Sequence, residues 1–133
     1  MGLIVGTQHI ETVEVTADKV DMFAKCTGDY NPIHMDDDYA KNTRFGKRIA
    51  HGMLSAGFIS RVLAMRLGAG GIYLAQSLKF LKPVFVGETI TVEVKVLTFQ
   101  DKRSIGTLET IVKNSAGEIA VKGEATIMLA DKI

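Results

Sequence analysis

The spacing of apolar residues becomes a strict alternation in the second half of the chain. Between residues 89 and 96, threonine, glutamate and lysine at odd positions alternate with isoleucine and valine at even positions. A period of two is typical of a strand with one buried face. Similar runs lie on both sides, and the turn NSAG separates the last two. The sequence therefore predicts strands over residues 72–83, 88–99, 104–114 and 118–129.

The first half of the chain predicts short helices with recognisable ends. Residues 16–28, TADKVDMFAKCTG, place Thr16 where an N-cap belongs and Gly28 where a helix stops. Residues 35–45, MDDDYAKNTRF, place Asp36 as a cap, with further acids in the first turn, where they suit the helix dipole.

A third helix is expected from residue 51 to the glycines at 68–71. Its apolar residues cover almost the whole circumference, so we expect it to be buried on all sides, with Met53 and Met65 in the core. Helices followed by long antiparallel strands indicate an α+β fold, and a curled sheet wrapped around one long buried helix satisfies both patterns. We expect a single domain over residues 1–133.

Composition and charge narrow the possible functions. The 133 residues are 47% hydrophobic and 23% charged, which is typical of a globular chain. The net charge of +1 gives no strong field that would favour nucleic acid or a membrane surface as a partner. No signal peptide or membrane-spanning segment is expected. Cys26 is the only cysteine, so an internal disulfide is excluded, a cytoplasmic location is expected, and we expect the thiol to be buried.

The segment CTGDYNPIHMDDDYA, residues 26–40, carries the first candidate chemistry. Asp29 and His34 flank a rigid turn, because Pro32 fixes its own φ and keeps Asn31 out of the helical region. A histidine exchanges protons near neutral pH, and a neighbouring carboxylate can orient it or share in activating a water. The spacing alone is also compatible with a turn that Asp29 and Asn31 merely cap.

The second candidate is HGM at residues 51–53, where Gly52 opens the third helix. Backbone amides at a helix N-terminus have no partner inside the helix and stabilise developing negative charge on an oxygen. Alternatively, Gly52 only allows another part of the chain to approach closely.

These segments together resemble one known family. GDYNPIH carries the signature Asp-x-Asn-Pro-[Ile/Leu]-His of the MaoC-like (R)-specific enoyl-CoA hydratases, which have the hot-dog fold, and HGM follows at the family's distance. The segment GGIYLAQSLKFLKPVFVGETI looks like the family's strand, Pro-Val turn and next strand. The likeness extends from about residue 12 to about residue 128, and it makes catalysis the leading interpretation.

The resemblance implies a role for each matching residue. Asp29 and His34 would bind and activate the water that attacks C3 of the enoyl group. The Gly52 amide would hold the thioester carbonyl oxygen. Ser60 would support the site from the third helix, although a serine can also bond back to its own helix. Asn31 would hold the shape of the loop.

The resemblance also implies partners and leaves three functions open. An acyl-CoA thioester is the expected substrate, no cofactor or metal is expected, and a homodimer or higher oligomer is expected. The alternatives are a dehydratase that acts on 3-hydroxyacyl groups of an acyl carrier protein, and a non-hydrating hot-dog binding protein or thioesterase. The intact Asp29 and His34 argue against the last of these.

A basic cluster and a cluster of histidines and aspartates can each be interpreted in two ways. Arg44, Lys47 and Arg48 either contact the phosphates of coenzyme A or form a solvated surface. His34, the aspartates at 36–38 and His51 offer metal-binding groups, but consecutive aspartates at a helix start are typical of a solvated first turn, so we expect no metal.

Overall fold

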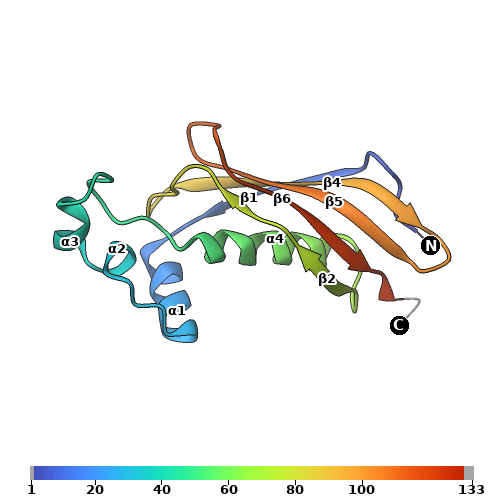
Figure 1. The fold of residues 1–133 in the computed structure, drawn as a ribbon, viewed down its shortest axis with the longest axis horizontal. Coiled ribbons are helices and arrows are strands. Elements are labelled where there is room, and N and C mark those ends of the chain that lie inside the picture. Colours follow the sequence, from blue (N-terminus) through green and yellow to red (C-terminus); the bar gives the residue numbers. More distant parts are fainter. Residues whose placement is uncertain (1, 131–133) are drawn as a thin grey trace.

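The computed structural model describes residues 2–130, which form one antiparallel sheet, a long central helix and three short helices (Figure 1). The sheet has the strand order β1-β4-β5-β6-β2, and β3 also pairs with β6. The strands are β1 (Gln8–Glu14), β2 (Ile72–Gln76), β3 (Lys79–Phe80), β4 (Thr89–Gln100), β5 (Ile105–Lys113) and β6 (Ile119–Met128).

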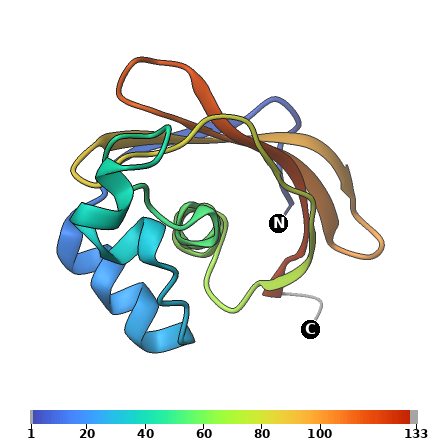
Figure 2. The same ribbon diagram turned by 60° about the vertical axis from the view of Figure 1, so that its left-hand side comes forward.

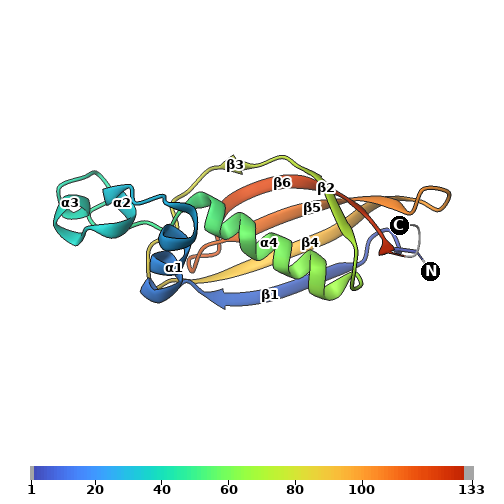
Figure 3. The ribbon, with the colours of Figure 1, turned by 90° about the horizontal axis from the view of Figure 1, so that it is seen from below.

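The sheet curls around α4 (Gly52–Arg66), which lies along its concave face (Figures 2 and 3). Every second residue is buried from Ile90 to Val96 on β4 and along β5, as the alternation predicts, and the apolar ones among them share one core with α4. Ile59, Val62, Ile90, Val94 and Leu108, each at most 1% exposed, lie in this core. The predicted α+β fold, a curled sheet around one helix, is confirmed.

Two short helices begin at the predicted caps, but the second ends at Lys41, four residues before the predicted end. In α1 (Ala17–Thr27) the Thr16 side chain accepts the Lys19 N–H, and Gly28 adopts φ 82°, a left-handed conformation that glycine accepts without strain. In α3 (Asp37–Lys41) the Asp36 carboxylate accepts the Tyr39 N–H at 3.1 Å. Between them lies α2 (Pro32–Met35), a single turn that was not predicted.

The strand predictions need two corrections. β1 was not predicted, and it precedes the helices and pairs with β4 along the edge of the sheet. The run 72–83 is not one strand, because it divides into β2 and β3. At the break, Ser77 crosses close to Gly123 of β6, where a Cβ on Gly123 would lie only 1.8 Å from the Ser77 carbonyl oxygen.

The prediction that α4 is buried on all sides is wrong. The sheet covers one face, on which Leu54, Ser55, Ile59, Val62 and Leu63 are buried. The opposite face is open within the chain, so that Met53 is 56% and Met65 76% exposed. Cys26 is also exposed, contrary to prediction, because it lies on the outer side of α1. None of the helices within residues 2–130 combines the length and apolar character needed to cross a membrane.

Candidate active site

The turn after α1 holds Asp29 through local hydrogen bonds. Gly28 reverses the chain, and the Asp29 N–H then donates to the Thr27 hydroxyl at 3.2 Å. The Asp29 carboxylate accepts the Asn31 N–H at 3.2 Å, and the Asn31 side chain in turn caps α2 by accepting the Ile33 N–H. The carboxylate is exposed and fixed relative to the start of α2.

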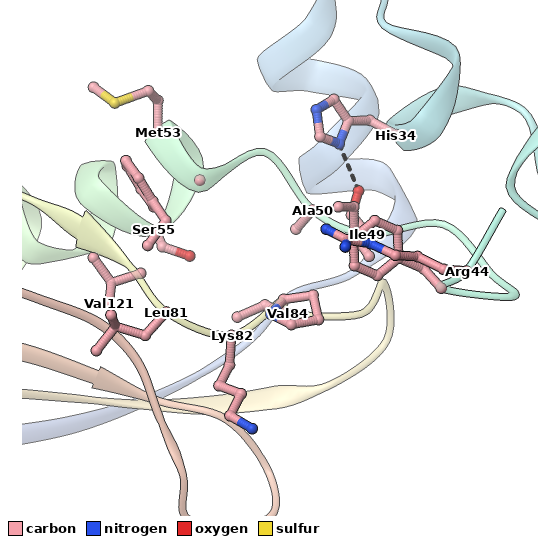
Figure 4. Close-up of a pocket in the computed structure, with 14 residues that line it drawn as sticks. His34, Arg44, Ile49, Ala50, Met53, Ser55, Leu81, Lys82, Val84 and Val121 are labelled. Atoms are coloured by element: carbon pink, nitrogen blue, oxygen red, sulfur yellow. Dashed lines mark hydrogen bonds between the residues drawn. The ribbon is translucent and has the colours of Figure 1, made fainter.

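His34 is fixed by its ring and by its backbone. Its Nδ1 lies 2.7 Å from the Ile49 carbonyl oxygen (Figure 4). A carbonyl can only accept, so Nδ1 carries the proton and Nε2 of the neutral ring keeps a free lone pair. The Arg48 guanidinium donates to the His34 carbonyl oxygen at 2.5 Å and pairs with Asp21 at 3.2 Å. His34 is therefore oriented to accept a proton at Nε2.

Burial lowers the pKa of the His34 imidazole below its ordinary value of 6.5. The neighbouring His51 and Arg48 also lower this pKa, whereas the bond to the Ile49 carbonyl and the Asp29 carboxylate oppose them. Since the net direction is downward, the neutral, basic form of His34 persists to a lower pH than in a free histidine.

Three ionisable groups converge beside this turn. One carboxylate oxygen of Asp29 and one ring nitrogen each of His34 and His51 lie within 4.8 Å of one another. A single water, with hydrogen bonds of about 2.8 Å to each side, spans such a distance. One carboxylate oxygen and two imidazole nitrogens also correspond in number and type to the protein ligands of a catalytic zinc ion. Asp29, His34 and His51 are therefore the residues that could hold a metal.

A cavity of about 400 Å³ opens next to His34, and Figure 4 shows it between the start of α4 and the segment that includes Leu81 and Lys82. Gly52, the first residue of α4, lines it, as does Phe80. A Cβ on Gly52 would lie 2.6 Å from the Phe80 ring, so the glycine does allow a close approach. Its amide is also one of the unpartnered N–H groups at the start of the 15-residue helix. The cavity is lined by His34, Arg44, Phe45, Ile49, Ala50, Gly52, Met53, Ser55, Phe80, Leu81, Lys82, Pro83, Val84 and Val121.

The two serines of α4 lie in different places. Ser60 lines a second, smaller pocket together with Leu63 and Tyr73. Ser55, which the sequence analysis did not single out, is 2% exposed and lines the cavity beside His34. Its only signal in the sequence is its position one turn after Gly52, which places it near the same end of the helix.

The predicted basic trio does not form one surface. The Arg48 guanidinium is engaged by His34 and Asp21, and the Lys47 ammonium lies 4.7 Å from the centre of the Phe85 ring. Arg44 alone of the three lines the cavity, together with Lys82, which sequence reasoning missed.

An antiparallel sheet curled around one helix is the hot-dog fold, and in this chain it brings an Asp–His pair to the N-terminal end of that helix. The chain belongs to the MaoC-like domain family, whose model matches residues 6–118. It is 49% identical over 109 residues to an (R)-specific enoyl-CoA hydratase of Rhodospirillum rubrum, covering 81% of this chain and 75% of that one.

Two further similarities extend over nearly the whole chain. A 3-hydroxybutyryl-CoA dehydratase of Methylorubrum extorquens is 39% identical over 131 residues, which cover 98% of this chain and 83% of that protein. The solved structure of an (R)-hydratase from A. caviae involved in PHA biosynthesis superposes with a TM-score of 0.93 at 41% identity, covering 96% of this chain and 97% of that one.

Proposed function

We propose that this protein is an (R)-specific enoyl-CoA hydratase, which adds water reversibly to a trans-2-enoyl-CoA to give the (R)-3-hydroxyacyl-CoA. The observation that carries the proposal is the convergence of Asp29, His34 and the first amide of α4 beside one cavity. The relatives named for this hydration and for the reverse dehydration support it.

Each of these groups has a role in the proposed addition. In the proposed reaction the substrate water binds between the Asp29 carboxylate and His34 Nε2, and these groups remove one of its protons as its oxygen bonds to C3. The C2–C3 π electrons move toward the thioester carbonyl, whose oxygen becomes enolate-like and accepts the Gly52 N–H. The proton taken from the water is then delivered to C2. One molecule of water is added, and no electron donor or acceptor is needed.

The first prediction concerns the reaction itself. The purified protein is expected to hydrate a short trans-2-enoyl-CoA, with loss of the absorbance of the conjugated thioester, and to yield the (R) alcohol. Prior dialysis against a chelator should leave the rate unchanged, because the proposed steps use only Asp29, His34 and Gly52. An (S) product would refute the proposal, and loss of activity in the chelator would assign a metal to Asp29, His34 and His51.

The same reaction can be run on two thioester carriers. Arg44 and Lys82 line the cavity and can meet a phosphate of coenzyme A or of a carrier protein's pantetheine arm. Matched assays with enoyl-CoA and with the enoyl carrier protein, in the hydration direction, separate the two substrates. A higher kcat/KM for the carrier protein would favour the dehydratase alternative.

The second prediction is the pH dependence of kcat/KM. If neutral His34 is the base, kcat/KM falls as the pH decreases through the pKa of His34 in the free enzyme. The direction of the pKa shift places this half-point below 6.5. A profile of kcat/KM against pH measures it, and His9→Gln serves as the control that should keep the same half-point. A half-point above 6.5 would contradict the role of a desolvated His34.

We also propose a homodimer formed through the open face of α4 and the β2 edge of the sheet. Ile72, Tyr73 and Leu74 on β2 are 43%, 38% and 46% exposed, and a groove of about 430 Å³ separates this strand from Met53 on α4. Unpaired, apolar strand edges are normally covered by another element or another chain. The opposite edge is protected by charge instead, because Glu11 on β1 pairs with Arg61 and Arg66.

The third prediction tests this interface with two matched substitutions. Wild-type protein is expected to sediment at micromolar concentration as a dimer of the 14.4 kDa chain. Leu74→Asp should shift it to monomer, because the dimer would bury an unpaired carboxylate at the β2 edge. Ile10→Asp, at a comparably exposed position on β1, should remain dimeric. A wild-type monomer with full activity would refute the proposed dimer.

A further inference from the structure

His51 is a buried polar residue that the proposed reaction does not use. It is 2% exposed and precedes Gly52 as the N-cap residue of α4. Side chains at this position usually accept an N–H of the first helical turn, but that of His51 makes no such bond. Its ring is directed instead toward the turn that carries Asp29.

The hydrogen bonds of His51 define its tautomer. Its Nε2 lies 3.0 Å from the Asp29 carbonyl oxygen, which can only accept, so Nε2 carries the proton. Among residues 2–130, Nδ1 of His51 has no hydrogen-bond partner. A buried polar atom without a partner is unusual and requires an explanation. A phenylalanine would fill the same space without burying an unpaired nitrogen, so the Nε2–H donor is what distinguishes histidine here.

The His51 ring also contacts two other aromatic rings. Its centroid lies 4.0 Å from the centroid of the His34 ring, with an angle of 33° between the two planes. The centroid of the Phe23 ring lies 4.7 Å away. His34 is thus held at Nδ1 by the Ile49 carbonyl and on its face by His51. These contacts leave its Nε2 as the ring atom available to a water.

The bond to Asp29 links parts of the site that are distant in sequence. The other bonds described for Asp29 are made by Thr27 and Asn31, two residues away on either side. The bond from His51 spans 22 residues and ties this turn to the start of α4, next to the Gly52 amide. His51 therefore contacts Asp29 and His34 and is bonded directly to Gly52.

We propose that His51 is a positioning residue, whose Nε2–H fixes the backbone of Asp29, so that the Asp29 carboxylate stays beside His34 and faces the oxygen bound by Gly52. The expected loss of kcat rests on the proposed hydratase function, whereas the hydrogen bonds of His51 do not depend on it. Since misplacing reacting groups by about 1 Å can cost on the order of 100-fold in rate, loss of the Nε2–H should lower kcat by about 10- to 100-fold.

Two substitutions at His51 separate the donor from the ring. His51→Gln keeps an N–H close to the position of Nε2 but removes the ring, whereas His51→Phe keeps the ring and removes the donor. If His51 acts by positioning, His51→Gln retains most of kcat, whereas His51→Phe lowers kcat by about 10- to 100-fold with little change in KM. Phe23→Leu is the packing control, since it weakens the ring contact with His51 and should lower the melting temperature without lowering kcat. The proposal fails if His51→Phe retains a higher kcat than His51→Gln. It also fails if Phe23→Leu lowers kcat as much as His51→Phe does, because the ring of His51 would then act only by packing.

The wild-type protein provides a test that does not depend on the folding of any variant. Nitrogen-15 NMR of the histidine rings distinguishes the two neutral tautomers, and the chain has only three histidines to assign. We expect an Nε2–H ring for His51 and an Nδ1–H ring for His34. An Nδ1–H tautomer at His51 would overturn the proposal, whatever the activity. Absence of hydration by a wild-type protein with the expected tautomers would instead refute the proposed function and leave the hydrogen bonds of His51 in place.

Discussion

Asp29→Asn and His34→Asn are each expected to lower kcat by about 10²–10⁴-fold, the range typical of a proton-transfer group. Both changes preserve the local hydrogen bonds. The amide oxygen of Asn at position 29 can still accept the Asn31 N–H, and an Asn at position 34 can still donate to the Ile49 carbonyl from near the Nδ1 position. The substrate should therefore still bind while the chemical step fails, so that KM changes much less than kcat.

The double variant is expected to cost little more than either single variant. Asp29 and His34 lie close enough to hold one water, and residues that act as a unit are strongly non-additive in kcat. Asp37→Asn is the matched control, because Asp37 is an exposed carboxylate of the same segment in the first turn of α3. Near wild-type rates in both folded single variants would show that residues 26–40 form only a structural turn. Fully additive losses would assign the two residues to separate steps.

Elements with local signals were predicted well from the sequence, and elements that depend on distant contacts were not. Thr16, Gly28 and Asp36 act on neighbouring backbone groups, so their residue types alone locate the ends of α1 and the start of α3. β1 has only one buried residue, Val13, and its strand conformation depends on pairing with β4, which starts 75 residues after β1 ends. Likewise, the break between β2 and β3 depends on the approach of Ser77 to Gly123 of β6.

The same distinction applies to the candidate site. Asp29, Asn31 and His34 lie within one short turn, where local hydrogen bonds join Asp29 to Asn31, and a carboxylate oxygen of Asp29 and a ring nitrogen of His34 lie within 4.8 Å of each other. The hydrogen bonds that Arg48 and His51 make to backbone carbonyls could not be predicted, because the carbonyl lies 14 residues away for Arg48 and 22 residues away for His51. A hydrophobic pattern also cannot show which face of a long apolar helix its own sheet leaves open, and α4 illustrates this at Met53 and Met65.

Gly52 offers an unusually direct way to remove one backbone N–H. It is the first residue of α4, where the N–H has no partner in the helix and proline is well tolerated. Gly52 does not adopt a positive φ, and His51 has φ −59° and ψ 133°, which is the conformation favoured before a proline. The obstacle is steric, because a Cβ at position 52 would meet the Phe80 ring. Phe80 is 53% exposed, so Phe80→Ala removes the clash at small cost to the fold.

In the Phe80→Ala background, Gly52→Pro is therefore expected to lower kcat by about 10²–10³-fold relative to Gly52→Ala. This range is typical for the removal of one oxyanion donor. Both variants carry a Cβ, but proline replaces the N–H by the Cδ of its ring, so their ratio reports the loss of this amide as a donor to the thioester oxygen. Stopped hydration assays at saturating enoyl-CoA measure kcat, and thermal melts verify that the two proteins have similar stability. Equal kcat values in two equally stable variants would show that Gly52 serves only to accommodate Phe80, and the donor to the carbonyl oxygen would have to be another group that lines the cavity, of which the buried Ser55 hydroxyl is the nearest along the helix.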